Sequence, residues 1–152
     1  MAIRLQFSRQ ADPISDLIAW FSAGNLSHVD AVLSNGYLLG ARSDRVGGKP
    51  PGVQIRPPNY AKFALKVIMT IPCTGEQEQA FQNFLYAQLG KPYDKTAILG
   101  FIVGRNWRED DSWFCSEAIA AALEAAGIFH PLYLAANKIT PSALALAVSA
   151  HS

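Results

Sequence analysis

The segment "SHVDAVLSNGYLLGAR" (residues 27–42) decides the fold of this chain. It holds two apolar runs, HVDAVL and YLLGAR, on either side of Ser34-Asn35-Gly36. An Asn-Gly pair between apolar runs is a strong signal for a tight turn between two antiparallel strands. We therefore predict a β-hairpin over residues 28–42. Strand alternation places His28 and Asp30 on one face of the sheet, with Val29 and Ala31 on the other.

Further strands and helices surround this hairpin. Residues 3–7, 52–57 and 64–72 have the apolar and β-branched composition of strands, and Pro72 ends the last one. Apolar spacing and end signals predict helices over residues 13–24, 76–90, 96–104, 115–126 and 140–150. Strands gathered in the middle and helices toward the end predict an α+β domain with an antiparallel sheet of about five strands.

Length, composition and charge exclude several classes of protein. A chain of 152 residues, 50% of them hydrophobic, predicts one globular domain over residues 1–152. A net charge of +1 with interspersed acids and bases gives no field that would attract nucleic acid or an anionic membrane. These features leave the oligomeric state undetermined.

The chain shows no signal for export or for a membrane span. The first ten residues alternate like a strand rather than a signal peptide, and the apolar run at 97–103 is too short to cross a bilayer. The two cysteines, Cys73 and Cys115, favour a reduced compartment. We expect a cytoplasmic protein or a component of a phage particle.

Cys115 opens the segment CSEAIAAALEAAG, at the predicted start of a helix. The unpaired N–H groups and the positive end of the helix dipole favour a thiolate there, which indicates a nucleophile. Cysteine is also commonly buried as a small apolar side chain. Cys115, Ile119 and Leu123 share one helical face, so the spacing equally fits core packing.

A nucleophilic thiol needs a base, and the chain has three histidines. His151 lies at the terminus and His130 precedes a proline, so both are interpreted as surface residues. His28 begins the first strand of the predicted hairpin. From there an imidazole could take the proton of Cys115, although a structural histidine bonded to backbone is an equally simple interpretation.

Four segments together, SHVDAVL, GKPYD (90–94), WFCSEAI (113–119) and ITPSAL (139–144), resemble the circularly permuted NlpC-type branch of the papain-like superfamily. That branch includes the YiiX-type proteins and the lecithin retinol acyltransferase-like enzymes. The resemblance implies a papain-like sheet packed against the cysteine helix, with Cys115 as nucleophile and His28 as base. It also implies that Tyr93 borders the site, although Tyr93 fits an aromatic residue in a Gly-Pro turn equally well.

The resemblance implies a third polar residue, on the strand after His28, which would orient the imidazole. This chain has Gly40 and its apolar neighbours there. Ser43 would oppose His28 across a two-residue turn, and Gln54 lies on the next strand. Asp30 is two residues from His28, where side chains stand side by side rather than tip to tip. We predict Gln54 as the third catalytic residue.

We assign Tyr93, Trp113 and Asp30 to the substrate side of this predicted site. The scattered histidines and cysteines lack metal-ligand spacing, and we expect no metal and no cofactor. The resulting hypothesis is a cysteine peptidase or amidase that cleaves an amide bond, as in cell-wall peptides, through a thioester. The alternatives are an acyltransferase or esterase acting on an acyl lipid, and a non-catalytic module of a phage or prophage particle.

Overall fold

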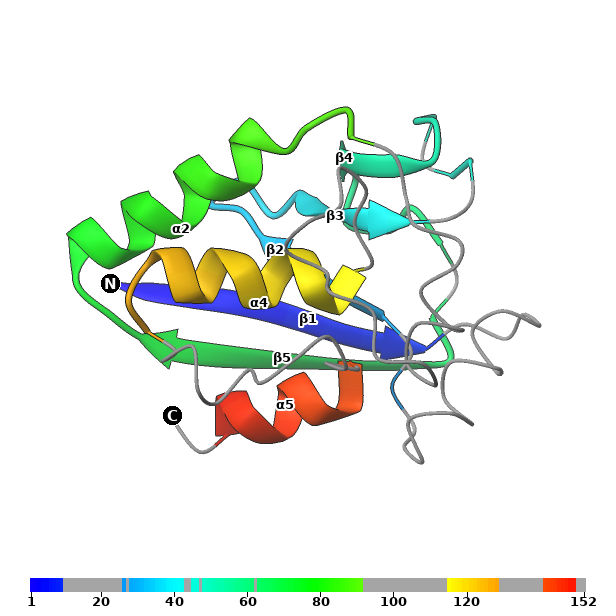
Figure 1. Cartoon of the computed structure of the whole chain (residues 1–152). Helices are drawn as coiled ribbons and strands as arrows, with labels where there is room; N and C mark the ends of the chain where they lie inside the picture. Colours follow the sequence, from blue (N-terminus) through cyan, green and yellow to red (C-terminus); the bar gives the residue numbers. More distant parts are fainter. Residues whose placement is uncertain are drawn as a thin grey trace, which may run out of the picture.

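A five-stranded antiparallel sheet forms the centre of the structure, a computed structural model of the chain (Figure 1). Its strand order is β4-β3-β2-β1-β5. The strands are β1 (Ala2–Arg9), β2 (His28–Val32), β3 (Leu38–Arg42), β4 (Gly52–Arg56) and β5 (Leu65–Pro72). The structure describes residues 1–9, 26, 28–42, 45–46, 48–61, 63–91, 115–128 and 141–149. The predicted α+β class and the five-stranded sheet are confirmed.

The hairpin between β2 and β3 differs from the prediction by one residue in its register. Ala31 pairs with Leu39 and Val32 with Leu38, so the loop has three residues rather than two. Gly36 closes it with φ 85°, and Gly36 N–H donates to the Leu33 carbonyl at 2.9 Å. A three-residue loop that ends in a left-handed glycine is a common hairpin type. Continued along the strands, this register brings Arg42, not Ser43, opposite His28.

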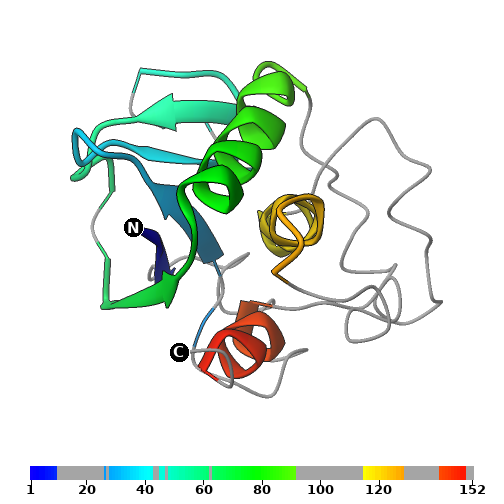
Figure 2. The same ribbon diagram turned by 90° about the vertical axis from the view of Figure 1, so that its left-hand side faces the viewer.

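Three helices occur in the described part of the chain, and all lie on one face of the sheet (Figures 1 and 2). They are α2 (Gly75–Ala87), α4 (Cys115–Ala125) and α5 (Pro141–Ser149). The predictions for these three segments are confirmed. The helices predicted over 13–24 and 96–104 fall outside the described residues.

The main hydrophobic core lies between the sheet and α4. Residues at alternating strand positions, such as Leu5 and Val29, are fully buried in it. They pack in one cluster with Ile119 and Leu123 of α4, both 0% exposed. This packing fixes the sheet face toward which α4, and with it Cys115, is held.

The opposite face of the sheet is also buried but carries polar side chains, among them Asp30, Arg42 and Arg56. β4 and β5 are the two edges of the sheet, so the connection between them has to cross it. Figure 2 shows this connection on the side away from the helices. Tyr60 belongs to the connection and is buried against this polar face.

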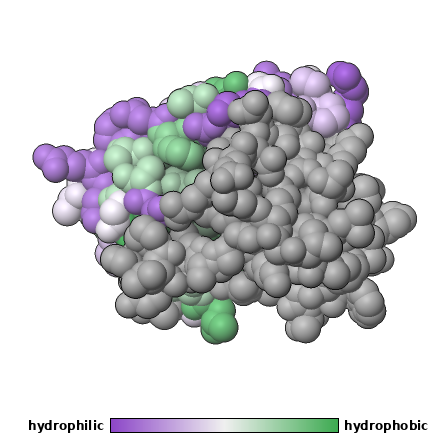
Figure 3. All heavy atoms as spheres, viewed as in Figure 1, coloured by the Kyte–Doolittle hydropathy of each residue, from purple (hydrophilic) through white to green (hydrophobic). Residues whose placement is uncertain are grey.

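The outer side of α2 mixes hydrophilic side chains with apolar ones (Figure 3). Tyr86 is 44% exposed and Leu89, just past the helix, is 38% exposed. No helix in the described residues is long and apolar enough to span a bilayer.

Candidate functional site

His28 and Asp30 meet at the start of β2. The ring Nε2 of His28 lies 3.0 Å from Oδ1 of Asp30, and the two side chains are 11% and 1% exposed. The interpretation that Asp30 stands too close in sequence to reach the ring was wrong. The two residues share one face of the strand, and the imidazole is long enough to lean along the strand toward the carboxylate.

This contact is close but not well aligned. Neither His28 Nε2 nor Asp30 Oδ1 has a hydrogen-bond partner of good geometry. The 3.0 Å distance is therefore a close contact between two polar atoms rather than a formed hydrogen bond.

The space that the Asp30 carboxylate occupies is provided by Gly40 on β3. A Cβ at position 40 would collide with Oδ1 of Asp30 and lie 3.2 Å from its Cγ. Gly40 is not among the glycines with positive φ, so its backbone conformation does not require glycine. Glycine is therefore required at position 40 because a side chain there would collide with the Asp30 carboxylate.

Tyr60 and Arg42 hold the carboxylate from its other side. The Tyr60 hydroxyl donates to Oδ2 of Asp30 at 2.7 Å and accepts from Nη1 of Arg42 at 3.2 Å. The guanidinium carbon atoms of Arg42 and Arg56 lie 5.1 and 5.9 Å from the centre of the Tyr60 ring. Neither Tyr60 nor Arg42 was predicted from the sequence. Strand alternation in the correct register would have placed Arg42 on the His28 face, but nothing in the sequence indicates Tyr60.

These contacts keep Asp30 ionised despite complete burial. Burial alone would raise the pKa of Asp30, but the neighbouring His28, the hydrogen bond from Tyr60 and the charge of Arg42 lower it. The net effect is a pKa below the ordinary value for aspartate. For Tyr60, burial and the neighbouring Asp30 charge raise the hydroxyl pKa, so it remains a proton donor.

Cys115 is the first residue of α4, as the sequence predicted, but its side chain is only 1% exposed. Burial and the Asp30 charge raise the pKa of Cys115 to about 12, although backbone hydrogen bonds at Val29 and Ser116 and the Arg42 charge lower it. The expectation of a thiolate at the helix start is therefore wrong for this structure. Desolvation outweighs the helix terminus, and the thiol is protonated at neutral pH.

The thiol and the ring come to the same end of β2. Cys115 contacts the backbone of Val29, the residue between His28 and Asp30. Figure 1 shows the first turn of α4, in yellow, over this end of the sheet. The Cys115 thiol and the His28 ring lie toward opposite faces of the sheet. By strand alternation, Val29 faces α4, while His28 and Asp30 belong to the polar face. The His28 ring contacts the Asp30 carboxylate on that polar face.

The structure does not bring Gln54 to the imidazole. Gln54 lies on β4 opposite Gly40, so it is level with Asp30 rather than with His28. Two strand spacings of about 4.8 Å separate β4 from β2. Asp30 makes the contact that was predicted for Gln54. Tyr93 and Trp113 fall outside the described residues.

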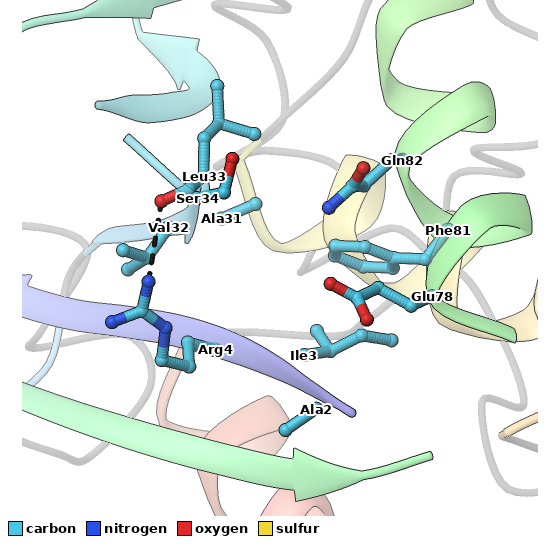
Figure 4. Close-up of a pocket in the computed structure, with 10 residues that line it drawn as sticks. All are labelled: Ala2, Ile3, Arg4, Ala31, Val32, Leu33, Ser34, Glu78, Phe81 and Gln82. Carbon is cyan, nitrogen blue, oxygen red and sulfur yellow. Dashed lines mark hydrogen bonds between the residues drawn. The ribbon is translucent and has the colours of Figure 1, made fainter. Parts of the chain in front are cut away.

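A pocket of about 220 Å³ lies at the other end of β2 (Figure 4). Its lining includes Arg4, Leu33, Glu78 and Phe81. The Arg4 guanidinium donates to the Leu33 carbonyl at 3.4 Å. Arg4 pairs with Val32, at the opposite end of the β1–β2 ladder from His28, so this pocket is separate from the Cys115 and His28 region.

The comparisons with known proteins define the fold but no family. No family model matches the chain, and no curated protein matches it. The crystal structure of the metalloprotein YiiX from Escherichia coli O157:H7 matches with a TM-score of 0.56 and 21% sequence identity. The match covers 81% of this chain and 64% of YiiX, so this chain spans less than two thirds of that protein.

This protein therefore has a YiiX-like α+β fold. The structure in hand places His28, Asp30, Tyr60 and Arg42 on the polar face of its sheet, and Cys115 at the start of α4. Within the described residues, no group of three or more His, Cys, Asp or Glu side chains could hold a metal ion.

Proposed function

We propose that this protein is a cysteine hydrolase with a permuted papain-like domain, in which Cys115 attacks an amide or ester carbonyl and His28 is the base. One observation carries the proposal. The first residue of α4 contacts β2 at Val29, directly between His28 and its ion-pair partner Asp30. A thiol from a distant part of the chain thus lies at the end of β2 that carries the imidazole and the carboxylate.

The raised pKa of Cys115 determines how the reaction would begin. With a pKa of about 12 the thiol is protonated at neutral pH, so its proton has to leave as the sulfur attacks. Asp30 lies at Nε2 of His28, which leaves Nδ1 as the atom to accept that proton. The ring has to turn toward the sulfur for this transfer.

The remaining steps follow the usual course of thiol acyl chemistry. Attack of Cys115 on the carbonyl carbon gives a tetrahedral oxyanion, and backbone N–H groups at the start of α4 are suited to stabilise it. The C–N or C–O bond breaks, His28 gives its proton to the leaving group, and a thioester to Cys115 remains. Water then cleaves the thioester, which releases the acid and regenerates the thiol.

The substrate class is supported only by the resemblance of the sequence motifs, which favours an amide bond of a cell-wall peptide over an acyl lipid. The test incubates the full chain with peptidoglycan fragments and, separately, with acyl lipids, each beside Cys115→Ser. We expect product from one substrate class, a transient mass increase on Cys115, and neither in the variant. Equal product with wild type and Cys115→Ser would contradict the proposal.

A second candidate function is a non-catalytic module of a phage or prophage particle that keeps the fold. The specific observation in its favour is that Cys115 is 1% exposed, a burial that raises its pKa to about 12. The rate of Cys115 alkylation, measured against pH in wild type and His28→Ala, separates the two functions. A base at His28 predicts faster alkylation of the wild type near neutral pH. Identical profiles would favour the non-catalytic module.

A further inference from the structure

We infer that Asp30 is the positioning residue of His28, and that Gly40 is glycine because its missing side chain admits the Asp30 carboxylate. As a statement about a catalytic base this inference rests on the proposed function, but the arrangement itself can be tested without a substrate. An imidazole that accepts a proton at one nitrogen works best when the other nitrogen is held by an acceptor.

The two oxygens of the Asp30 carboxylate have different partners. Oδ2 accepts from the Tyr60 hydroxyl at 2.7 Å, whereas Oδ1 faces His28 Nε2 at 3.0 Å and has no other polar partner in the part of the chain that the structure describes. The carboxylate is 1% exposed, so water does not compensate for a missing contact. His28 is thus the one group that can satisfy this oxygen among the described residues.

Gly40 provides an independent observation for the same arrangement. Asp30 and Gly40 are neighbours across β2 and β3, and the carboxylate lies over the glycine backbone. An alanine there would displace the carboxylate, because the new Cβ would occupy the position of Oδ1. A residue on the same strand as the histidine therefore fills the space that a side chain from β3 would otherwise take.

The hydrogen-bond chain around Asp30 has a fixed direction. Arg42 can only donate, so the Tyr60 hydroxyl accepts from Arg42 and donates its single proton to Asp30. The carboxylate can only accept, so the contact with His28 requires a proton on Nε2. This direction assigns the lone pair of the neutral ring to Nδ1, the atom that a base facing Cys115 would use.

The experiment follows the Nε2 proton of His28 by NMR in the full chain, with no substrate present. We expect a downfield, slowly exchanging imidazole N–H resonance in the wild type, because the bond to a buried carboxylate deshields and protects it. Asp30→Ala and Gly40→Ala should both abolish it. Persistence of the same resonance in Asp30→Ala or in Gly40→Ala would overturn the inference.

Thermal unfolding of each variant shows whether it is folded. Tyr60→Phe serves as a second variant that leaves the carboxylate in place and removes one of its anchors. Faster exchange of the same proton in Tyr60→Phe is the expected result, and an unchanged exchange rate would count against the inference.

Activity measurements separate the inference from the proposed function. With an active substrate, Asp30→Ala should lower kcat by about 10²-fold or more with little change in KM, the range in which general base catalysis acts. An inactive wild type with the expected NMR results would refute the hydrolase and leave the His28–Asp30–Gly40 arrangement standing. Full kcat in Asp30→Ala would refute the positioning role alone.

Discussion

At Cys115 two physical effects on one thiol oppose each other. The first turn of a helix offers backbone N–H groups and a favourable dipole, and both lower a thiol pKa. Burial in the core and the Asp30 charge raise it, and they prevail, with a pKa of about 12. The sequence shows the helix start but not the surroundings of the sulfur. Desolvation is a property of the folded molecule, which is why the sequence predicts a thiolate where the fold raises the thiol pKa.

At Asp30 burial also raises the pKa, but here the neighbouring groups outweigh it and the pKa is lowered. This predicts a loss of stability in acid. The folded-state pKa of Asp30 is lowered, so the ionised carboxylate stabilises the folded protein above the unfolded-state pKa of about 3.9. This contribution is lost as the pH falls through the folded-state pKa. We expect the free energy of unfolding of the wild type, measured in urea between about pH 2 and 5, to fall with decreasing pH.

The Asp30→Asn variant should lack this part of the pH dependence, because its amide does not titrate. Glu76→Gln is the matched control, since Glu76 is an exposed carboxylate on α2. The control should keep the acid dependence of the wild type. Parallel curves for wild type and Asp30→Asn would show that Asp30 is not the group responsible.

At the scale of single elements, local signals were the most reliable guide. Helix α2 begins with a capping box in which Thr74 accepts from Gln77 N–H at 3.1 Å and its own N–H donates to the Gln77 side chain at 3.0 Å. The chain also turns where Asn35-Gly36 predicts a turn. The register between β2 and β3 was less certain because loops of two and of three residues share the Asn-Gly signal.

The capping box of α2 leads to a prediction about stability. Thr74→Ala removes the side-chain acceptor of one helix N–H and should lower the free energy of unfolding by about 1 kcal/mol. Thr74→Ser keeps the hydroxyl and should stay close to wild type. Urea unfolding followed by circular dichroism measures both variants, and an equal loss in the two would show that the hydroxyl is not what matters.

At the scale of the whole molecule, the packing of α4 on the sheet holds the site together. The helix contributes Ile119 and Leu123 to the core, and its first residue is Cys115. Any shift of α4 along the sheet would therefore move the sulfur relative to His28. Core packing and the geometry of the candidate site are coupled through this one helix.

The different burial of two leucines predicts different losses of stability when each is replaced by alanine. Leu123→Ala should lower the free energy of unfolding by about 2–5 kcal/mol, because Leu123 is 0% exposed and its removal leaves a cavity. Leu146→Ala on α5 is the matched control, since Leu146 is 74% exposed, and its effect should stay within about 0.5 kcal/mol. Chemical denaturation measures both. Similar losses in the two variants would contradict the placement of the core.

The sequence by itself determined the elements of this protein. Alternating apolar residues, the Asn35-Gly36 turn, the prolines and the helix caps are local signals, and they predicted the five strands, the three described helices and Cys115 at a helix start. They also identified His28 as the histidine at the start of a central strand. Each of these features depends on residues a few positions apart, which the sequence displays directly.

Only the tertiary structure decided what surrounds these groups. Asp30 rather than Gln54 contacts the ring, Gly40 makes the room, and Tyr60 completes the polar cluster from the connection between β4 and β5. The thiol is protonated because the fold removes it from water. Such features depend on cross-strand register, on the path of a connection over the sheet and on burial, and these are set by the packing of segments distant in the chain.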